Sequence, residues 1–385
     1  MRPYLQSPMG VWSMKKIIFL QKLFLLLLFS CASIPSARQP SVVPLEDFQN
    51  DKMAERITAV VTPQIGIKNV GAIVAIYNKG KLSFLPFGET VRGNKTLPTA
   101  DTIFEIGSVT KTFTGLMLAR SIDLDRVTPT DTLDQFKEEW RGQKVGSINL
   151  TELITHRSGL PRLPCNLHPS DRNQPYQEYT ENDLIEGLKD SVFNSNCELQ
   201  PHPTSTINYS NWALAVLGYV LASKQRTSYE ALLHELVLDP LKLTDTALTF
   251  TPDQEKRFAT GYNTSFVKSQ WKNQILQGQG AVKSSARDIM KYAQIYLHPK
   301  QSFFENSVRR VTQVSFETKD TAIGYAWFVK KNGSIWHNGQ TGGFYTLIKI
   351  YPKRDLVVFY LTNTARELKC FMQAVEEVPC DPTFE

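Results

Sequence analysis

The chain has 385 residues, of which 42% are hydrophobic and 21% are charged, a balance typical of a globular protein and not of a disordered one. Its formal net charge of +6 comes mainly from the N-terminus, because residues 1–31 hold four basic residues and no acidic ones, which leaves 39 basic and 37 acidic residues in the remainder. The remainder shows no stripe of Lys and Arg interleaved with aromatic residues, which argues against a nucleic-acid partner.

Residues 1–31 predict a signal peptide. Lys15 and Lys16 precede an interrupted apolar stretch that reaches Phe29, and this stretch is too short to cross a bilayer, which needs about 20 residues. Residues 28–31 resemble a bacterial lipobox, so plain cleavage and a lipid on Cys31 both stay open. That lipid would be the only link to a membrane. Residues 32–50 are expected to be a tether, and we expect an exported, periplasmic monomer.

Four cysteines follow Cys31, and an even number in an exported chain permits two disulfides. The sequence alone does not establish the pairing, although Cys165–Cys197 and Cys370–Cys380 are the local options. No spacing of Cys and His suggests zinc, so we expect neither a metal nor another cofactor.

Strand patterns dominate both ends of the chain. Met53, Ile57, Val60 and Val61 recur at helical spacing and predict an amphipathic helix. Two apolar runs that flank a turn at Gly80 then predict a β-hairpin. Near the C-terminus, short runs rich in aromatic and β-branched residues predict an antiparallel meander, followed by a last helix. The hairpin strands are residues 70–77 and 82–87, and the meander strands are residues 325–329, 335–338, 346–351 and 356–362.

Helical patterns dominate the middle of the chain. The predicted helices are residues 113–121, 182–188, 213–222, 229–238 and 286–297, with loops rich in Pro and Asn between them. We therefore expect an α+β fold, in which one antiparallel sheet is built from both chain ends, flanked by helices, and interrupted by an inserted, mainly helical lobe. Residues 51–112 and 290–385 are assigned to the sheet domain and residues 113–289 to the helical domain.

The first chemical motif is Ser108-Val-Thr-Lys111, at the start of a predicted helix. Two residues three positions apart share one helix face, and a helix N-terminus points free N–H groups at an incoming carbonyl oxygen. A serine hydroxyl needs a base, and lysine is one only where burial or nearby positive charge lowers its pKa. Ser13 and Ser265 also precede a lysine by three residues, but only Ser108 follows an apolar run and a glycine. The alternative is an N-cap serine with a solvated lysine.

Two further motifs supply a phenol, an amide and an imidazole. In Tyr209-Ser-Asn211, the phenol can relay protons, and the amide can bind a substrate carbonyl or hold the lysine; the alternative is a helix cap with a packed tyrosine. His337 lies in a predicted strand that runs into glycines. Gly339 would let a substrate lie against that strand, and the Gln340 N–H would serve as an oxyanion donor. A turn histidine is the alternative.

In this order and separation, the motifs resemble those of the serine β-lactamase and penicillin-binding family, specifically the branch of class C β-lactamases, D,D-carboxypeptidases, D-aminopeptidases and related esterases. Residues 153–161 and 280–288 are similar to segments of the same branch. The resemblance implies that Ser108 is the acylated nucleophile, and that Lys111 and Tyr209 share proton transfer. It implies substrate contacts from Asn211, His337, Gly339 and Gln340, and an oxyanion hole from the amides of Ser108 and Gln340. His156, in the first segment, is expected to be structural.

One departure concerns the third motif, where class C β-lactamases usually carry Lys-Thr-Gly and this chain has His337-Asn-Gly339. Because histidine titrates near pH ~6.5, we expect carboxylate binding to be weaker and to increase as the pH falls. The leading hypothesis is an exported serine hydrolase that acts through an acyl-serine on D-alanyl peptides of peptidoglycan, on β-lactams, or on both. An esterase or D-aminopeptidase of the same fold, and a non-catalytic penicillin-binding sensor, stay open.

Overall fold

The computed structural model describes residues 52–273 and 275–380. The predicted signal peptide, the lipid on Cys31 and the tether of residues 32–50 lie outside the described residues.

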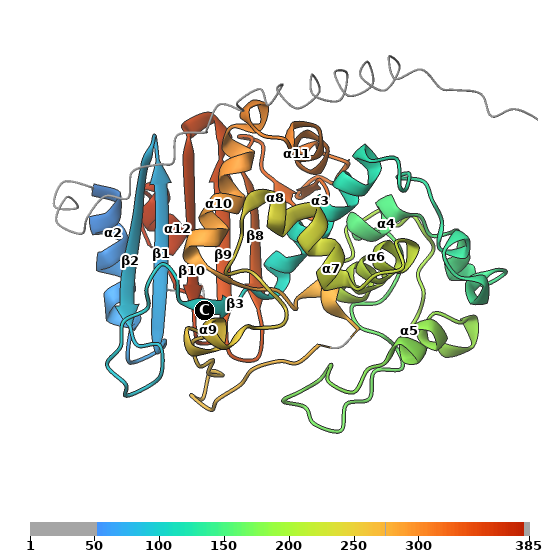
Figure 1. Cartoon of the computed structure of the whole chain (residues 1–385), viewed down its shortest axis with the longest axis horizontal. Helices are drawn as coiled ribbons and strands as arrows, with labels where there is room; N and C mark the ends of the chain where they lie inside the picture. Colours follow the sequence, from blue (N-terminus) through green and yellow to red (C-terminus); the bar gives the residue numbers. More distant parts are fainter. Residues whose placement is uncertain (1–51, 274, 381–385) are drawn as a thin grey trace, which may run out of the picture. The chain divides into compact units, whose positions relative to one another are not determined.

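An eight-stranded sheet joins the two ends of the described chain, in the order β2-β1-β10-β9-β8-β7-β6-β5 (Figure 1). All neighbouring strands are antiparallel, and β1 is paired on both sides, with β2 and with β10. Ala72 lies opposite Thr362, so segments almost 300 residues apart pair as neighbouring strands of the sheet. These pairings confirm the predicted α+β fold. The strands are β1 (Gly71–Asn78), β2 (Lys81–Gly88), β5 (Phe316–Glu317), β6 (Ala322–Ile323), β7 (Phe328–Val329), β8 (Ile335–Gln340), β9 (Tyr345–Tyr351) and β10 (Leu356–Thr362).

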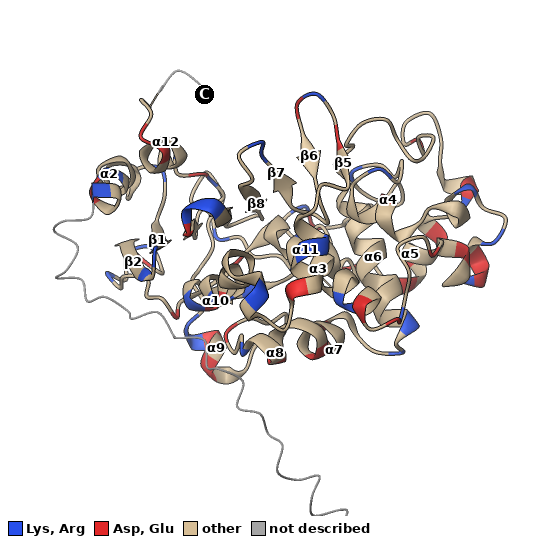
Figure 2. Ribbon diagram, turned by 90° about the horizontal axis from the view of Figure 1, so that it is seen from above, with Lys and Arg blue, Asp and Glu red and all other residues tan. Residues whose placement is uncertain are grey.

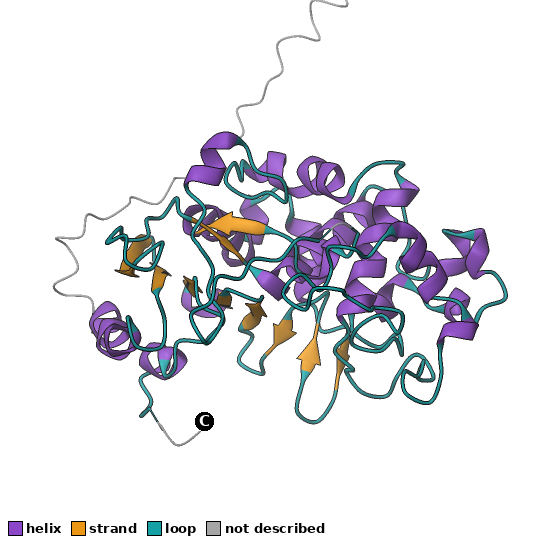
Figure 3. Ribbon diagram, turned by 90° about the horizontal axis from the view of Figure 1, so that it is seen from below, coloured by secondary structure: helices purple, strands orange, loops and turns teal. Residues whose placement is uncertain are grey.

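Helices cover both faces of this sheet (Figures 1 and 3). On one face, α2 (Lys52–Val61) and α12 (Phe371–Glu376) pack against alternate side chains of β1 and β10, such as Val74 and Val358. On the other face, α10 (Ala286–Leu297) and α3 (Thr110–Asp123) join the larger apolar core that contains Ile73 and Phe359. Because both faces are covered, β10 is buried along its whole length and its sequence is continuously apolar.

The remaining helices lie mainly between β2 and β5 in the chain, as the helical pattern predicts. They are α4 (Leu150–Ile154), α5 (Glu181–Gly187), α6 (Asn211–Lys224), α7 (Tyr229–Leu233), α8 (Asp239–Leu241), α9 (Pro252–Lys256) and α11 (Glu305–Thr312). A small second sheet, β3 (Ile103–Glu105) with β4 (Lys283–Ser285), was not predicted, because each strand has only three residues. The assigned boundary between a sheet domain and a helical domain stays a prediction.

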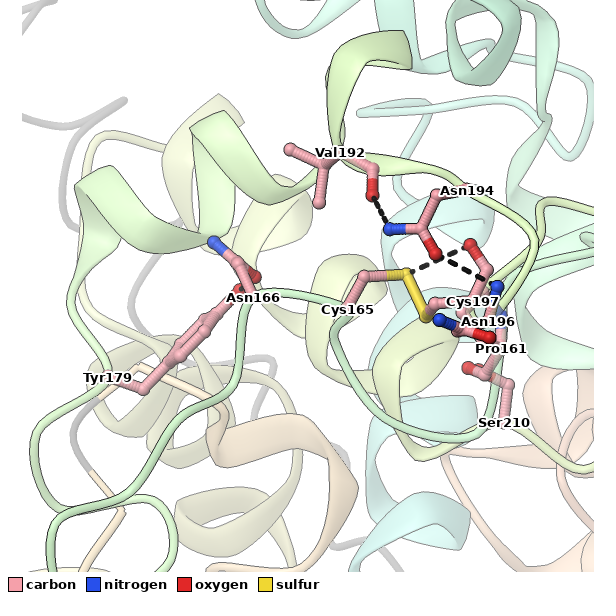
Figure 4. The surroundings of a disulfide bond; sticks show 9 residues. All are labelled: Pro161, Cys165, Asn166, Tyr179, Val192, Asn194, Asn196, Cys197 and Ser210. Atoms are coloured by element: carbon pink, nitrogen blue, oxygen red, sulfur yellow. Dashed lines mark hydrogen bonds between the residues drawn. A yellow bond between two sulfur atoms is a disulfide. The ribbon is translucent and has the colours of Figure 1, made fainter.

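One predicted strand is shorter than expected. Of residues 325–329, only Phe328 and Val329 form a strand, because Ala326 has a φ of 62° and the Gly324 N–H donates to the Trp327 carbonyl, which closes a turn. Both local cysteine pairs are bonded. Cys165–Cys197 ties the loop that follows Pro161 to the segment that precedes Ser210 (Figure 4), and Cys370–Cys380 closes the C-terminal helix.

Basic and acidic residues are interspersed along the ribbon in Figure 2. Several of them pair, as in Arg257 with Asp245 and Arg287 with Asp101. Within the described ranges, no helix combines the length and the apolar character needed to cross a bilayer.

Candidate active site

The three motifs meet at one cavity of about 560 Å³. It is bounded by the N-terminal turn before α3, the start of α6, strands β7 and β8, and two loops around residues 162–176 and 271–280. Its described lining residues are Ser108, Arg162, Leu163, Tyr176, Tyr209, Asn211, Trp271, Asn273, Gln279, Gly280, Phe328, Trp336, Asn338, Gln340 and Thr341.

Ser108 and Lys111 lie side by side where a short 3-10 turn, Gly107–Val109, runs into α3. The Lys111 Nζ is 2.9 Å from the Ser108 Oγ and donates to the Gln279 carbonyl at 2.6 Å. The segment that carries Gln279 is held against α3 by two further bonds: Thr114 Oγ1 donates to the Gly278 carbonyl, and the Val282 N–H donates to Thr110 Oγ1. The Lys111 amine is therefore held between the Ser108 hydroxyl and the Gln279 carbonyl.

Lys111 is fully buried and forms no ion pair with any described carboxylate. Burial lowers its pKa well below the ordinary value, and the positive charge of Arg162 lowers it further. A lower pKa increases the fraction of the amine that is neutral and keeps a lone pair able to accept the Ser108 proton. A lysine base requires burial or nearby positive charge, and Lys111 has both.

Tyr209 lies directly before α6, and its hydroxyl faces Ser108. Burial raises the pKa of Tyr209 to about 12, although the hydrogen bond with Ser108 opposes this shift. The Lys111 Nζ is 5.0 Å from the centroid of the Tyr209 ring, and the Arg162 Cζ is 5.1 Å from the same centroid. The Ser108 hydroxyl thus lies between an amine whose pKa is lowered and a phenol whose pKa is raised.

The backbone after Tyr209 is fixed by its neighbours. The Ser210 Oγ accepts from the Ala213 N–H at 2.9 Å and donates to the Pro161 carbonyl at 2.7 Å, and the Ser210 N–H donates to Nδ1 of His156 at 3.1 Å. The buried His156 ring lies 4.4 Å from the Tyr209 ring, centroid to centroid. Asn211 begins α6 and lines the cavity, and its Oδ1 has no hydrogen-bond partner among the described residues.

The open edge of β8 forms another wall of the site. Strand β7 pairs with β8 only at Ile335 and Trp336, so no described strand covers that edge from residue 337 to residue 340. This edge lies directly against the turn that carries Ser108. A Cβ at Gly339 would collide with the Ile106 carbonyl and would lie 2.8 Å from the Ser108 nitrogen. Only glycine therefore allows β8 to approach the turn that carries Ser108 this closely.

His337 is placed differently from the expectation. Strand alternation turns Trp336, Asn338 and Gln340 toward the cavity, whereas His337 is buried behind its wall, and Gly339 also does not line it. Burial, with a smaller contribution from Lys111, lowers the pKa of His337 to about 3. Its Nδ1 lies 2.6 Å from the Asn338 carbonyl. The expected titration of His337 near neutral pH is therefore wrong, because the sequence does not show how deeply the ring is buried.

The sequence reasoning missed several residues of the cavity, among them Arg162, Gln279, Tyr176 and Trp271. Two of them had a signal, since Arg162 directly follows the segment of residues 153–161 and Gln279 directly precedes the segment of residues 280–288. The aromatic residues lie in loops without any pattern. No group of three or more potential metal ligands occurs within the ranges that the structure describes.

Comparison with known proteins identifies the class to which this fold and cavity belong. The β-lactamase family model matches residues 57–374, and the chain belongs to this family. It is accordingly a serine hydrolase.

Two relatives are a D-alanyl-D-alanine-carboxypeptidase/endopeptidase, AmpH, and a β-lactamase, both of Escherichia coli. The first is 26% identical over 327 residues, which cover 76% of this chain and 79% of AmpH. The second is 23% identical over 351 residues, which cover 82% of this chain and 88% of the β-lactamase.

Two solved structures share the fold. A β-lactamase/D-alanine carboxypeptidase from Pseudomonas syringae matches with a TM-score of 0.71 and 18% identity, over 84% of this chain and 98% of the other. A class C β-lactamase from Rhodobacter sphaeroides matches with a TM-score of 0.70 and 20% identity, over 85% of this chain and 97% of the other.

Proposed function

We propose that the protein is an exported serine hydrolase that forms an acyl-enzyme at Ser108 with D-alanyl peptides of peptidoglycan and with β-lactams, and then releases the acyl group to water. The observation that carries this proposal is the 2.9 Å separation between the Ser108 Oγ and the fully buried Lys111 Nζ, which forms no ion pair with a described carboxylate. A buried amine without a counter-ion is costly, and its placement at a hydroxyl is the arrangement that activates a serine nucleophile.

In the first step, the Ser108 Oγ attacks the substrate carbonyl and its proton passes to the Lys111 Nζ. The developing oxyanion is held by the backbone N–H groups of Ser108 and Gln340. Tyr209 then donates its proton to the leaving nitrogen and regains one from Lys111. In the second step, water attacks the acyl carbonyl and gives a proton to the Lys111 and Tyr209 pair. The pair returns a proton to the Ser108 Oγ, which leaves as the free hydroxyl. General acid–base groups contribute about 10²- to 10⁴-fold to such reactions, and one oxyanion donor about 10²- to 10³-fold.

The charge around the cavity favours carboxypeptidase or β-lactamase activity over the D-aminopeptidase alternative. An aminopeptidase must bind the ammonium group at the N-terminus of its substrate, which calls for a carboxylate. No Asp or Glu is among the described residues that line the cavity, and its one charged residue is Arg162. The names of AmpH and of the Pseudomonas syringae protein point to the same substrates.

The test is turnover. The purified protein and Ser108→Ala are incubated with an N-acyl-D-alanyl-D-alanine peptide, with penicillins, with a D-alanyl amide that has a free N-terminus, and with a simple ester. We expect D-alanine release or β-lactam opening that Ser108→Ala lacks. Turnover of only the ester or only the D-alanyl amide would contradict the substrate assignment. Covalent labelling by penicillin without turnover of any substrate would instead indicate a sensor.

Export and a monomeric state belong to the same proposal. The signal-peptide pattern supports export, as do the two disulfides, which persist in oxidising compartments. Fractionation of cells that produce the full chain and a Cys31→Ser variant tests the location. Periplasmic release of the variant, from a protein otherwise held at the membrane, would indicate a lipid on Cys31. Recovery of both proteins in the cytoplasm would contradict export.

A further inference from the structure

We propose that Arg162 binds the carboxylate of the substrate's leaving group, a role that His337 does not fill. This inference rests on the proposed function, because it names the substrate group that the same cavity recognises. The third motif lacks the lysine found in the class C enzymes that it resembles, and His337 is buried behind the cavity wall. Another cation is therefore needed if a carboxylate is to be bound strongly.

Arg162 is the one residue with a formal charge among the described residues that line the cavity. Its side chain is exposed, and no described residue pairs with the guanidinium through an ion pair or a side-chain hydrogen bond. Its described contact is with the face of the Tyr209 ring. A guanidinium carries its charge at any working pH and presents parallel N–H donors that match a carboxylate. Arg162 is thus a free cation at the edge of the reaction site.

The backbone of Arg162 is held tightly although its side chain is unpaired. Its carbonyl accepts from the N–H groups of Asn211 at 2.9 Å and Trp212 at 3.2 Å, which ties it to the first turn of α6. The preceding residue, Pro161, is bound by the Ser210 hydroxyl. The disulfide of Cys165 lies three residues further along the same loop (Figure 4). The backbone of Arg162 is therefore held next to the start of α6, close to Tyr209, which positions a residue for substrate recognition.

The position of the charge specifies which end of the substrate it contacts. The Arg162 Cζ is 5.1 Å from the ring centroid of Tyr209, the residue assigned to protonate the leaving nitrogen. In a D-alanyl-D-alanine peptide, the carboxylate is attached to the carbon next to that nitrogen. In a penicillin, the carboxylate is likewise attached to the carbon next to the lactam nitrogen. Both substrate classes would thus place a carboxylate beside the guanidinium while the leaving nitrogen faces the phenol.

The alternative is that Arg162 only packs on Tyr209 and helps to keep Lys111 neutral. In that case, the loss of Arg162 would slow every substrate alike, whether or not it carries a carboxylate. The two roles can be separated by substrate pairs that differ only in that group.

The experiment measures the acylation rate constant, as kcat/KM or as the second-order rate of inactivation, for benzylpenicillin and its methyl ester, and for an acyl-D-alanyl-D-alanine peptide and its C-terminal amide. The proteins are the full chain, Arg162→Gln and Arg162→Lys. A charge-assisted bond contributes about 10- to 100-fold. We expect the acid-to-neutral ratio to fall by about that factor in Arg162→Gln for both pairs, and by less in Arg162→Lys, which keeps the charge but loses the bidentate geometry.

An unchanged ratio in Arg162→Gln would overturn the inference, as would an unmodified protein that does not prefer the acid to the neutral partner. A fall in the ratio for one pair only would assign Arg162 to that substrate class. If Arg162→Gln fails to fold, Arg162→Lys and the preference of the unmodified protein still decide the question. Failure of the proposed function is distinguishable, because then no member of either pair would acylate Ser108.

Discussion

The proposed neutrality of Lys111 can be tested through stability as well as activity. Replacement by Met keeps a long, apolar side chain in the buried site and removes the amine. Burial lowers the pKa of Lys111 in the folded protein well below 10.5, so at a pH between the folded and the unfolded pKa the amine is neutral when folded and protonated when unfolded. The unfolded chain then binds one more proton, and stability rises with pH from the lowered folded pKa up to 10.5.

The size of this pH dependence follows from the one extra proton that the unfolded chain binds. The Lys111 contribution to the unfolding free energy should increase by about 1.4 kcal/mol per pH unit in that window, and Lys111→Met should lack it. Urea unfolding at about pH 8.5 and about pH 9.5, followed by tryptophan fluorescence, gives the slope for each protein, and their difference isolates the lysine because the other titrating groups are shared. In parallel, acylation should fall by about 10²-fold or more.

Equal pH slopes in the two proteins would refute this reasoning, since they would mean that Lys111 is protonated in the folded protein and has no lone pair to offer. Acylation at an undiminished rate in Lys111→Met, with the same residue labelled, would refute its role as the base. Lys111→Arg serves as a matched control, because it places a permanent cation in the site without providing a base near neutral pH.

Three further predictions concern the site's walls. Gly339→Ala should slow acylation by about 10²-fold or more, because its Cβ would push the β8 edge from Ser108; stopped-flow acylation at the unmodified rate would contradict this. Since the pKa of His337 is about 3 when folded, KM for carboxylate substrates should show no step near pH ~6.5; a step that His337→Ala abolishes would contradict this. Double replacement of Cys165 and Cys197 by Ser should cost about 3–4 kcal/mol of stability and raise KM for carboxylate substrates; an unchanged urea midpoint and KM would contradict it.

Much of the fold could be predicted because its apolar pattern is strong and local. The hairpin of β1 and β2 and the helix α10 appear where their periodicity places them. The joining of both chain ends in one sheet followed from the strand patterns at each end. The two-residue strands β5 and β6 were not predicted, and β7 is shorter than its predicted strand, since such short strands depend on pairing with neighbours and not on a periodic sequence.

The motif residues could be chosen from the sequence, but not their electrostatic environment. Ser108, Lys111 and Tyr209 each belong to a short motif, and the structure places the Lys111 amine and the Tyr209 hydroxyl next to the Ser108 hydroxyl. The lowered pKa of His337 depends on the burial of its ring on the side of β8 that faces away from the cavity, and the importance of Arg162 depends on the absence of acidic residues among the described residues that line the cavity. Both are properties of the folded surface, which segments distant in the chain create together. Their catalytic and binding roles stay predictions.

The measurement that tests the central claim most directly is peptide mapping by mass spectrometry after brief exposure of the full chain to benzylpenicillin. We predict a single covalent adduct, with the mass of the opened penicillin, on the peptide that contains Ser108, and its loss in Ser108→Ala. An adduct on another residue, or a penicillin opened without any dependence on Ser108, would contradict the account.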